Sequence, residues 1–205
     1  SVDIVNLFVD ANKLVVSTKG KNKAHSREYK TYKRVYDAEI PLIVLVDGGS
    51  ASASEIVSGS IQDYDRGIVV GENSYGKGLV QITQPLTYNA QLKVTTSKYY
   101  TASGRCIQRL DYASRDTDGK VPEVPDSLIT EFKTMAGRVV FDGAGINPDV
   151  EVLKPSSSDY LKALEKNHLI FDFATKFYRS NETIDEPSSF QLADKDLNEF
   201  KSFVM

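Results

Sequence analysis

A predicted strand, a glycine-rich turn and a predicted helix follow one another directly in the first third of the chain. Residues 41–46 read PLIVLV, a continuous apolar run that is typical of a strand buried on both faces in a parallel or mixed sheet. The run ends at residues 47–49, Asp-Gly-Gly, and residues 50–65 then carry apolar side chains at helical spacing. Gly67 lies where a glycine is expected to end this helix. The succession indicates an α/β arrangement with a turn of small residues between strand and helix.

The remaining sequence predicts further strands and a helical C-terminal section. β-Branched and aromatic residues gather in short runs that are typical of strands. These runs are residues 14–18, 67–71, 79–83, 92–100 and 150–153, and residues 2–9 fit a short amphipathic helix. From Ser157 the pattern becomes helical, with an apolar stripe from Leu161 to Phe177 and a second short helix over residues 193–204. We expect this last section to pack as an appendage rather than to form a site.

Composition and charge narrow the classes of function. The chain carries 25 Lys and Arg against 28 Asp and Glu, a net charge of -3, so it offers no broad positive field for nucleic acid. The single Cys106 cannot form an internal disulfide, and with His25 and His168 it makes no zinc-like ligand cluster. No apolar stretch approaches the ~20 residues that span a bilayer. We therefore expect no nucleic acid, no metal and no membrane span.

Three serines alternate with alanines at the start of the predicted helix, in residues 50–55, Ser-Ala-Ser-Ala-Ser-Glu. N–H groups at a helix N-terminus lack intrahelical partners, so a serine placed there has donors beside it that can stabilise an oxyanion. The same residues also fit a capping box, in which Ser52 and Glu55 only satisfy backbone groups. Taken alone, this stretch favours the cap.

A serine nucleophile needs a base, and Lys77 is the most suitable residue for that role. His25 lies in a basic hydrophilic stretch and His168 in the C-terminal helical section, so neither supports a histidine triad. Lys77 lies between Gly76 and Gly78, which let the backbone pass closely and can allow the lysine to point inward. A surface lysine in a turn is the alternative interpretation.

Residues 71–78, GENSYGKG, also come within one residue of the phosphate-binding loop G-x-x-x-x-G-K-[ST]. Gly78 replaces the hydroxyl residue that would bind magnesium, and a strand-like run closed by Pro85 follows where that loop needs a helix. A nucleotide-binding domain that uses residues 71–78 stays open as an alternative. A non-catalytic scaffold module, in which Ser52 is only a cap, is another.

Short motifs occur in a fixed order between residues 50 and 149. They are Ser50–Ile56 (SASASEI), Gln62–Tyr64 (QDY), Gly71-Glu72, Gly76–Gln81 (GKGLVQ), Tyr99–Arg105 (YYTASGR) and Gly145–Asp149 (GINPD). In this order they resemble the carboxy-terminal processing (tail-specific) protease family of S41-type serine peptidases. The resemblance implies an α/β fold with a crotonase/ClpP-like spiral β-α core and a mixed β-sheet. That core would cover residues 1–155, and a helical C-terminal appendage would cover residues 156–205.

The resemblance implies a role for each site residue. Ser52, the middle serine of the Ser-Ala-Ser-Ala-Ser run, would be the nucleophile, and Lys77 of the Gly-Lys-Gly turn would be the general base. Gln81, four residues after the lysine, would help to hold it in place, and the Ala53 N–H would be one oxyanion-hole donor. Asp63 falls at a family position that matters for activity. Because a carboxylate close to Lys77 would favour the ammonium form, we expect Asp63 to support the site structurally.

The resemblance further implies a serine endopeptidase that acts through an acyl-enzyme, needs no cofactor and cleaves protein substrates recognised near their C-termini. The family's second oxyanion donor and its PDZ domain would precede residue 1. We therefore expect an N-terminally truncated catalytic core that is inactive or weakly active by itself. Family members usually work in the bacterial periplasm or the thylakoid lumen, which predicts an extracytoplasmic location in the periplasm or cell envelope. Ser1 to Phe8 lack the features of a signal peptide.

Overall fold

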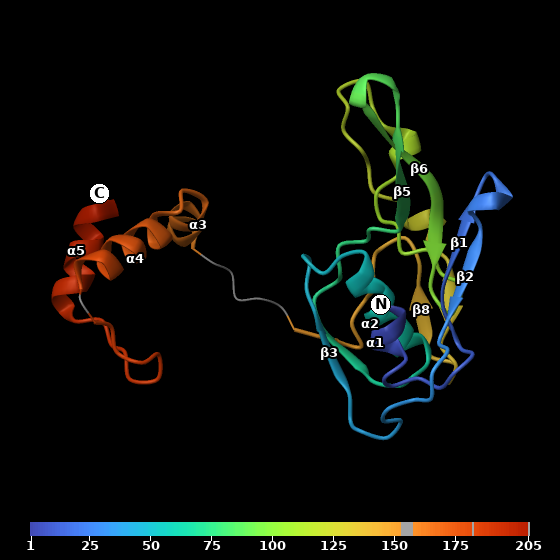
Figure 1. The fold of residues 1–205 in the computed structure, drawn as a ribbon, viewed down its shortest axis with the longest axis horizontal. Coiled ribbons are helices and arrows are strands. Elements are labelled where there is room, and N and C mark those ends of the chain that lie inside the picture. Colours follow the sequence, from blue (N-terminus) through green and yellow to red (C-terminus); the bar gives the residue numbers. More distant parts are fainter. Residues whose placement is uncertain (153–157, 182, 205) are drawn as a thin grey trace. The chain divides into compact units, whose positions relative to one another are not determined.

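The computed structural model describes residues 1–152, 158–181 and 183–204, and the chain divides into two units (Figure 1). The first unit is Ser1–Leu153 and the second is Lys154–Met205. The predicted boundary between residues 155 and 156 lies outside the described residues. No helix in the described ranges is both long enough and apolar enough to cross a bilayer.

The predicted strand, turn and helix of residues 41–65 are present in the first unit. β3 (Ile43–Val46) leads into the Asp-Gly-Gly turn, α2 (Ala53–Asp63) follows, and β4 (Ile68–Gly71) runs parallel to β3. β9 (Val150–Glu151) pairs with the other side of β4, so this sheet has the order β3-β4-β9 and is parallel throughout. The carboxyl ends of β3 and β4 therefore lie at the same edge of the sheet, where the turn into α2 begins.

The end of α2 differs from the sequence prediction. The helix ends at Asp63 with Tyr64 as its C-cap, and Asp65 takes the left-handed conformation (φ 52°) that Gly67 was expected to supply. Gly67 passes close to another strand instead, because a side chain at this position would lie 2.7 Å from the carbonyl oxygen of Leu42. The glycine is thus needed for close packing rather than for ending the helix.

β3 is buried on one face only, so the prediction of burial on both faces is wrong. Val46 is 7% exposed, whereas Ile43 and Leu45 are 63% and 77% exposed. Side chains alternate between the two faces of a strand, and the described residues of this unit cover only the face that carries Val44 and Val46. An apolar run shows that neither face carries polar side chains, but it does not show what covers each face.

A second, antiparallel sheet has the strand order β2-β1-β6-β5. Its strands are β1 (Leu14–Gly20), β2 (Arg27–Lys30), β5 (Leu79–Pro85) and β6 (Gln91–Tyr100). β5 and β6 form the long hairpin seen in Figure 1, and its register pairs Gln81 with Thr95. The strands predicted from the sequence in these regions are thus present, with slightly different ends.

The N-terminal helix is shorter than predicted. α1 covers Val2–Val5, and turns replace the second half of the expected helix. The Asn6 side chain attaches the end of this helix to a distant segment, because its Oδ1 accepts from the N–H groups of Tyr32 and Lys33 at 3.0 and 2.7 Å. The remaining short elements are the 3₁₀ turns Lys23–His25, Thr87–Asn89, Tyr112–Ser114 and Asp126–Leu128, and the paired strands β7 (Glu131–Lys133) and β8 (Val139–Phe141).

The hydrophobic core of the first unit surrounds α2, which contacts α1, β1 and β4. Its buried apolar side chains come from the two larger sheets, both helices, the turn after α1 and the loops after β6. They are Val5, Val9, Val15, Val16, Val46, Ile61, Val69, Tyr99, Ile107 and Ile146. Tyr99 thus has its ring in this core.

The second unit is helical, as predicted. α3 (Asp159–Lys166) precedes α4 (Leu169–Ser180), and α5 (Asp194–Val204) matches the helix expected over residues 193–204. The Phe173 ring is 7% exposed and its centroid lies 5.1 Å from that of Phe200 and 5.7 Å from that of Phe203. The fold class is therefore the predicted one, a mixed α/β unit followed by a helical C-terminal unit.

Candidate active site

Ser52 occupies the sharp turn between β3 and α2. It is the N-cap residue of α2, and Glu55 completes a capping box from the third helical position. An ordinary N-cap residue has an extended backbone, but Ser52 has φ 58° and ψ -112°. This conformation is costly for a residue with a side chain, and residues held in such conformations cluster at active sites. Ser52 is therefore a cap whose backbone geometry points to a second role.

Asp47 holds the glycine-rich turn that precedes Ser52. Its Oδ1 accepts from the Gly49 N–H at 3.0 Å, and from the N–H and the hydroxyl of Ser50 at 3.1 and 3.2 Å. The Ser50 carbonyl in turn accepts from the Tyr75 N–H at 2.9 Å, which attaches this turn to the segment that carries the lysine. Ala53 is the first residue of α2, where N–H groups have no intrahelical partner and can stabilise an oxyanion.

Glu55 links the Ser52 turn to the Lys77 turn. Its carboxylate is fully buried, with an exposed fraction of 0%. Oε2 accepts from the N–H groups of Ser52 and Lys77 at 2.7 and 2.9 Å. Oε1 accepts from the Ser74 hydroxyl and the Gly76 N–H at 2.5 and 2.6 Å. A buried carboxylate needs such partners, so these four donors fix the two chain segments relative to each other.

The Gly-Lys-Gly turn passes through a narrow gap, as the sequence predicted. A side chain at Gly76 would lie 2.5 Å from Cβ of Arg109, and one at Gly78 would lie 2.9 Å from the backbone nitrogen of Gln108. β5 begins at Leu79, immediately after this turn. The segment that follows Lys77 is therefore a strand and not the helix that a phosphate-binding loop requires.

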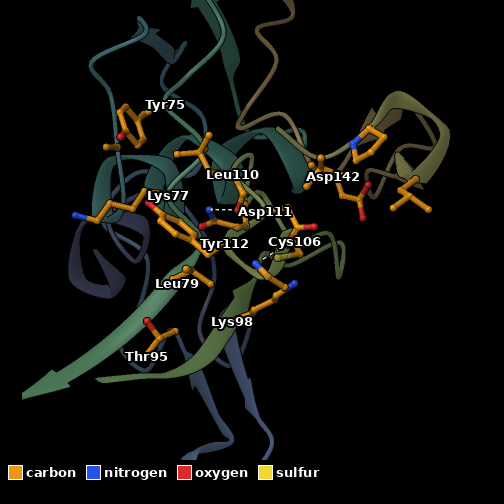
Figure 2. Close-up of a pocket in the computed structure, with 18 of the residues that line it drawn as sticks. Tyr75, Lys77, Leu79, Thr95, Lys98, Cys106, Leu110, Asp111, Tyr112 and Asp142 are labelled. Carbon is orange, nitrogen blue, oxygen red and sulfur yellow. Dashed lines mark hydrogen bonds between the residues drawn. The ribbon is translucent and has the colours of Figure 1, made fainter. Parts of the chain in front are cut away.

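The Lys77 side chain is exposed and does not point inward. Figure 2 shows its amine pointing away from the side chains of Cys106 and Lys98. Ser52 and Lys77 are instead brought together through their main chains. Besides sharing Glu55, both have carbonyl oxygens beside the Tyr99 hydroxyl, which lies 3.2 Å from Ser52 O and donates to Lys77 O.

Gln81 lies on the exposed part of β5. Its Nε2 donates to Oγ1 of Thr95, the residue opposite it in the hairpin, at 3.3 Å. The amide is thus engaged across the strand pair rather than with Lys77. The role of Gln81 in holding the lysine stays a prediction.

Asp63 lies at the other end of α2 from Ser52, in a buried ion pair with Arg105. Its Oδ1 is 2.9 Å from Nη2 of Arg105, and the two side chains are 1% and 0% exposed. The second carboxylate oxygen accepts from the Ser103 N–H at 2.8 Å. Burial lowers the pKa of Arg105, and the Asp63 carboxylate opposes this shift. These partners support the expected structural role of Asp63.

A cavity of about 1270 Å³ opens beside the Ser52 and Lys77 turns (Figure 2). Gly48, Gly49 and Ala51 line it near the Ser52 turn, polar side chains such as Lys98 and Asp142 line part of the rest, and later segments add four branched aliphatic side chains. These are Leu79, Leu110, Val124 and Leu128. Burial raises the pKa of the Cys106 thiol in this cavity, which disfavours the thiolate that a cysteine nucleophile would need. Cys106 is therefore poorly suited to act as a nucleophile in this cavity.

Comparison with known proteins shows the family of the chain. The family described as peptidase family S41 matches residues 1–114. The chain belongs to this family. A second family, described as "Probable PDZ-protease, C-terminal helical domain", matches residues 160–205, which include most of α3 and all of α4 and α5.

Several relatives of this S41 family member are carboxy-terminal processing proteases. One from Bartonella bacilliformis is 41% identical over 108 residues, which are 53% of this chain and 25% of the relative. A chloroplastic C-terminal processing peptidase from Tetradesmus obliquus is 33% identical over 111 residues, covering 53% of this chain and 23% of that one. The solved photosystem II D1 C-terminal processing protease is 26% identical, with a TM-score of 0.52 over 74% of this chain and 30% of that chain. The chain thus matches about a quarter of the length of these curated relatives.

Two groups of this S41 site were missed as functional residues in the sequence. In the sequence, Glu55 belongs to the capping box and to the Ser50–Ile56 motif, and Tyr99 belongs to the Tyr99–Arg105 motif, but neither residue is assigned a role at the site. The capping box was a partial signal for Glu55, because it placed a carboxylate beside the Ser52 N–H. Its bonds to Gly76 and Lys77 reach 21 and 22 residues along the chain, so no local pattern could reveal them.

Proposed function

We propose that this chain is the catalytic part of a serine endopeptidase of the carboxy-terminal processing type, with Ser52 as nucleophile and Lys77 as general base. The observation that carries the proposal is the main-chain geometry of the two residues. Ser52 has a strained backbone at a helix N-terminus. Its N–H and C=O groups contact the same Glu55 and Tyr99 side chains as the N–H and C=O groups of Lys77. Such rigid support is what a catalytic pair requires and a simple cap does not.

The proposed reaction is acyl transfer. The Ser52 hydroxyl attacks a peptide carbonyl carbon while the neutral Lys77 amine accepts its proton, and the Ala53 N–H stabilises the oxyanion. The C–N bond then breaks, and the leaving amine takes the proton from Lys77. Water attacks the resulting ester, with its proton passing to Lys77 and then to the departing Ser52 oxygen. Every step uses groups of this chain, the substrate and one water molecule.

Lys77 can act as a base only as the neutral amine, and its side chain is exposed in this structure. A peptide bound over this side chain would exclude water from it and confine the amine beside the scissile bond. The cavity beside Lys77 is large enough to hold a peptide segment. We therefore propose that substrate binding completes the environment of the base.

The substrates and the location follow from the relatives only as proposals. The names of the relatives describe proteases that process carboxy-terminal ends, in bacteria and in a chloroplast. We propose protein substrates cleaved near their C-termini and recruited through a PDZ domain, which the name of the second matching family suggests. We also propose an extracytoplasmic site of action, such as the bacterial periplasm or cell envelope. Gln81 is proposed to hold Lys77 once substrate is bound.

Hydrolysis of a quenched peptide library by the intact protein tests the proposal. Ser52→Ala and Lys77→Ala should each lower kcat by about 1000-fold or more, since both remove a group of one catalytic unit. Ser54→Ala and Lys93→Ala are the matched controls and should leave kcat unchanged. Full activity in Ser52→Ala would refute the assignment of Ser52 as the nucleophile. Turnover by the 205-residue chain alone, lost in Lys77→Ala, would contradict the prediction that this chain by itself is inactive or weakly active.

A further inference from the structure

The Tyr99 side chain reaches from β6 to the main chains of Ser52 and Lys77. Its ring is 4% exposed and belongs to the hydrophobic core. Its hydroxyl lies 3.2 Å from the carbonyl oxygen of Ser52 and also donates to the carbonyl oxygen of Lys77. The Tyr99 N–H donates to Gly78 O at 2.9 Å, so the backbone of β6 is attached to the same turn.

The chemistry of this contact requires a protonated phenol. Both neighbours are carbonyl oxygens, which only accept hydrogen bonds, so a single phenolic hydrogen must serve two acceptors. Without that hydrogen the three oxygens would repel one another. Burial, followed by the negative charge of Glu55, raises the pKa of Tyr99 and keeps the hydroxyl protonated throughout the physiological range.

Tyr99 and Glu55 act on opposite ends of the same two residues. One carboxylate oxygen of Glu55 accepts from the N–H groups of Ser52 and Lys77. The phenolic oxygen of Tyr99 lies beside the carbonyl groups of the same two residues. Each of the two residues is therefore held at both its N–H and its C=O, although 25 positions separate them in the sequence.

We propose that Tyr99 is a positioning residue for the Ser52–Lys77 pair, whose hydroxyl fixes the main chains of the nucleophile and the base relative to each other. The inference rests on the proposed function, because it concerns the geometry of that pair. It assigns the hydroxyl to catalysis and the ring to the core. Removing the hydroxyl alone should therefore slow the chemical step without reducing the number of competent sites.

The test is Tyr99→Phe in the intact protein, with Tyr100→Phe as the control. Tyr100 is the next residue of β6, and its side chain lies on the opposite face of the strand. A fluorophosphonate reagent that reacts with the nucleophilic serine counts the competent sites at its end point. Peptide hydrolysis then gives kcat per competent site. We expect Tyr99→Phe to lower this kcat by about 10- to 100-fold with KM unchanged, since a small displacement of a catalytic group costs that much.

The outcomes separate this inference from the proposed function. If the unmodified protein is not labelled at Ser52, the proposed function fails. If it is labelled and Tyr99→Phe keeps the same kcat per site, the function stands and the role of Tyr99 is refuted. Fewer competent sites with an unchanged kcat, or a variant that does not fold, would also refute it, because either result assigns the hydroxyl to the fold. Tyr100→Phe should match the unmodified protein in both measurements.

Discussion

At the scale of single residues, Glu55 carries a larger share of the site geometry than a helix cap needs. Its two oxygens accept from four donors, which come from the Ser52 turn and from residues 74–77. The residue is also fully buried, and its bonds to the Ser74 hydroxyl and the Gly76 N–H lie in a buried environment. The stability of both turns should therefore depend on this one carboxylate.

Glu55→Gln tests that dependence with almost no change in shape. The amide keeps one acceptor oxygen but turns an NH₂ group toward two of the donors, so at least two buried N–H or O–H groups lose their partner. We expect the free energy of unfolding to fall by about 1–3 kcal/mol, measured by urea denaturation. The Glu123 side chain is 67% exposed. The control Glu123→Gln should therefore change the free energy of unfolding by less than about 0.5 kcal/mol. Equal effects in the two variants would show that the bonds to Glu55 contribute little.

Ser52 and Lys77 could be selected from the sequence because their signals are local. A run of small residues before a helical pattern marks the first, and two flanking glycines mark the second. Tyr99 gives no such signal, since its contacts reach back 22 and 47 residues to carbonyl groups that carry no sequence information. The exposure of Lys77 was also not predictable, because it depends on which segments cover the turn.

At the scale of elements, the Lys77 turn fits only because glycines flank it. Gly76 has φ 82°, and a side chain there would lie 2.5 Å from Cβ of Arg109. Gly119 has the same φ of 82°, but a side chain there would meet nothing within 4 Å. The two positions therefore share the backbone cost of a left-handed residue and differ only in the clash.

Substituting alanine at these two glycines separates the two costs. Gly119→Ala should lower the free energy of unfolding by the left-handed penalty alone, about 1–2 kcal/mol. Gly76→Ala should add about 1–3 kcal/mol of overpacking and should also reduce peptidase activity, because the turn that carries Lys77 must shift. Urea unfolding and kcat measured on both variants give the comparison. Similar losses at the two positions would mean that the turn is not tightly confined.

The order of the elements was predictable, whereas their burial was only partly so. The strand–turn–helix succession at residues 41–65 follows from local periodicity and glycine placement. Ile43 and Leu45 belong to the same apolar run as Val46, yet they are exposed. Periodicity describes a strand's own side chains and says nothing about the element that packs on each face.

At the scale of the first unit, Arg138 connects the end of α2 to the start of β9. It pairs with Asp65 at 2.6 Å and also with Asp149. The N–H of Ala136 donates to the second oxygen of Asp65 at 2.5 Å. Burial raises the pKa of Asp65, but the bonds from Ala136 and Arg138 outweigh it and leave the pKa below its usual value of 3.8.

This pKa shift predicts how stability depends on pH. As pH falls to about 4, the unfolded chain binds a proton at Asp65 before the folded protein does. The contribution of Asp65 is therefore fully present above that pH and is lost as pH falls through the folded pKa. In Asp65→Asn the free energy of unfolding should be lower at pH 7, and the difference from the unmodified protein should shrink toward pH 2. Asp118→Asn, in an exposed loop, is the control. A difference that stays constant with pH would contradict the ion-pair account.

The central claim concerns chemistry at Ser52, and a serine-directed fluorophosphonate probe tests it most directly. The probe is applied to the intact protein and the labelled residue is identified by mass spectrometry. We predict labelling at Ser52, its loss in Lys77→Ala and its retention in Lys93→Ala, because only Lys77 activates the hydroxyl. Absence of labelling would favour a scaffold module, and magnesium-dependent nucleotide binding would favour a loop over residues 71–78. Labelling of Ser52 at an undiminished rate in Lys77→Ala would contradict the Ser-Lys pair.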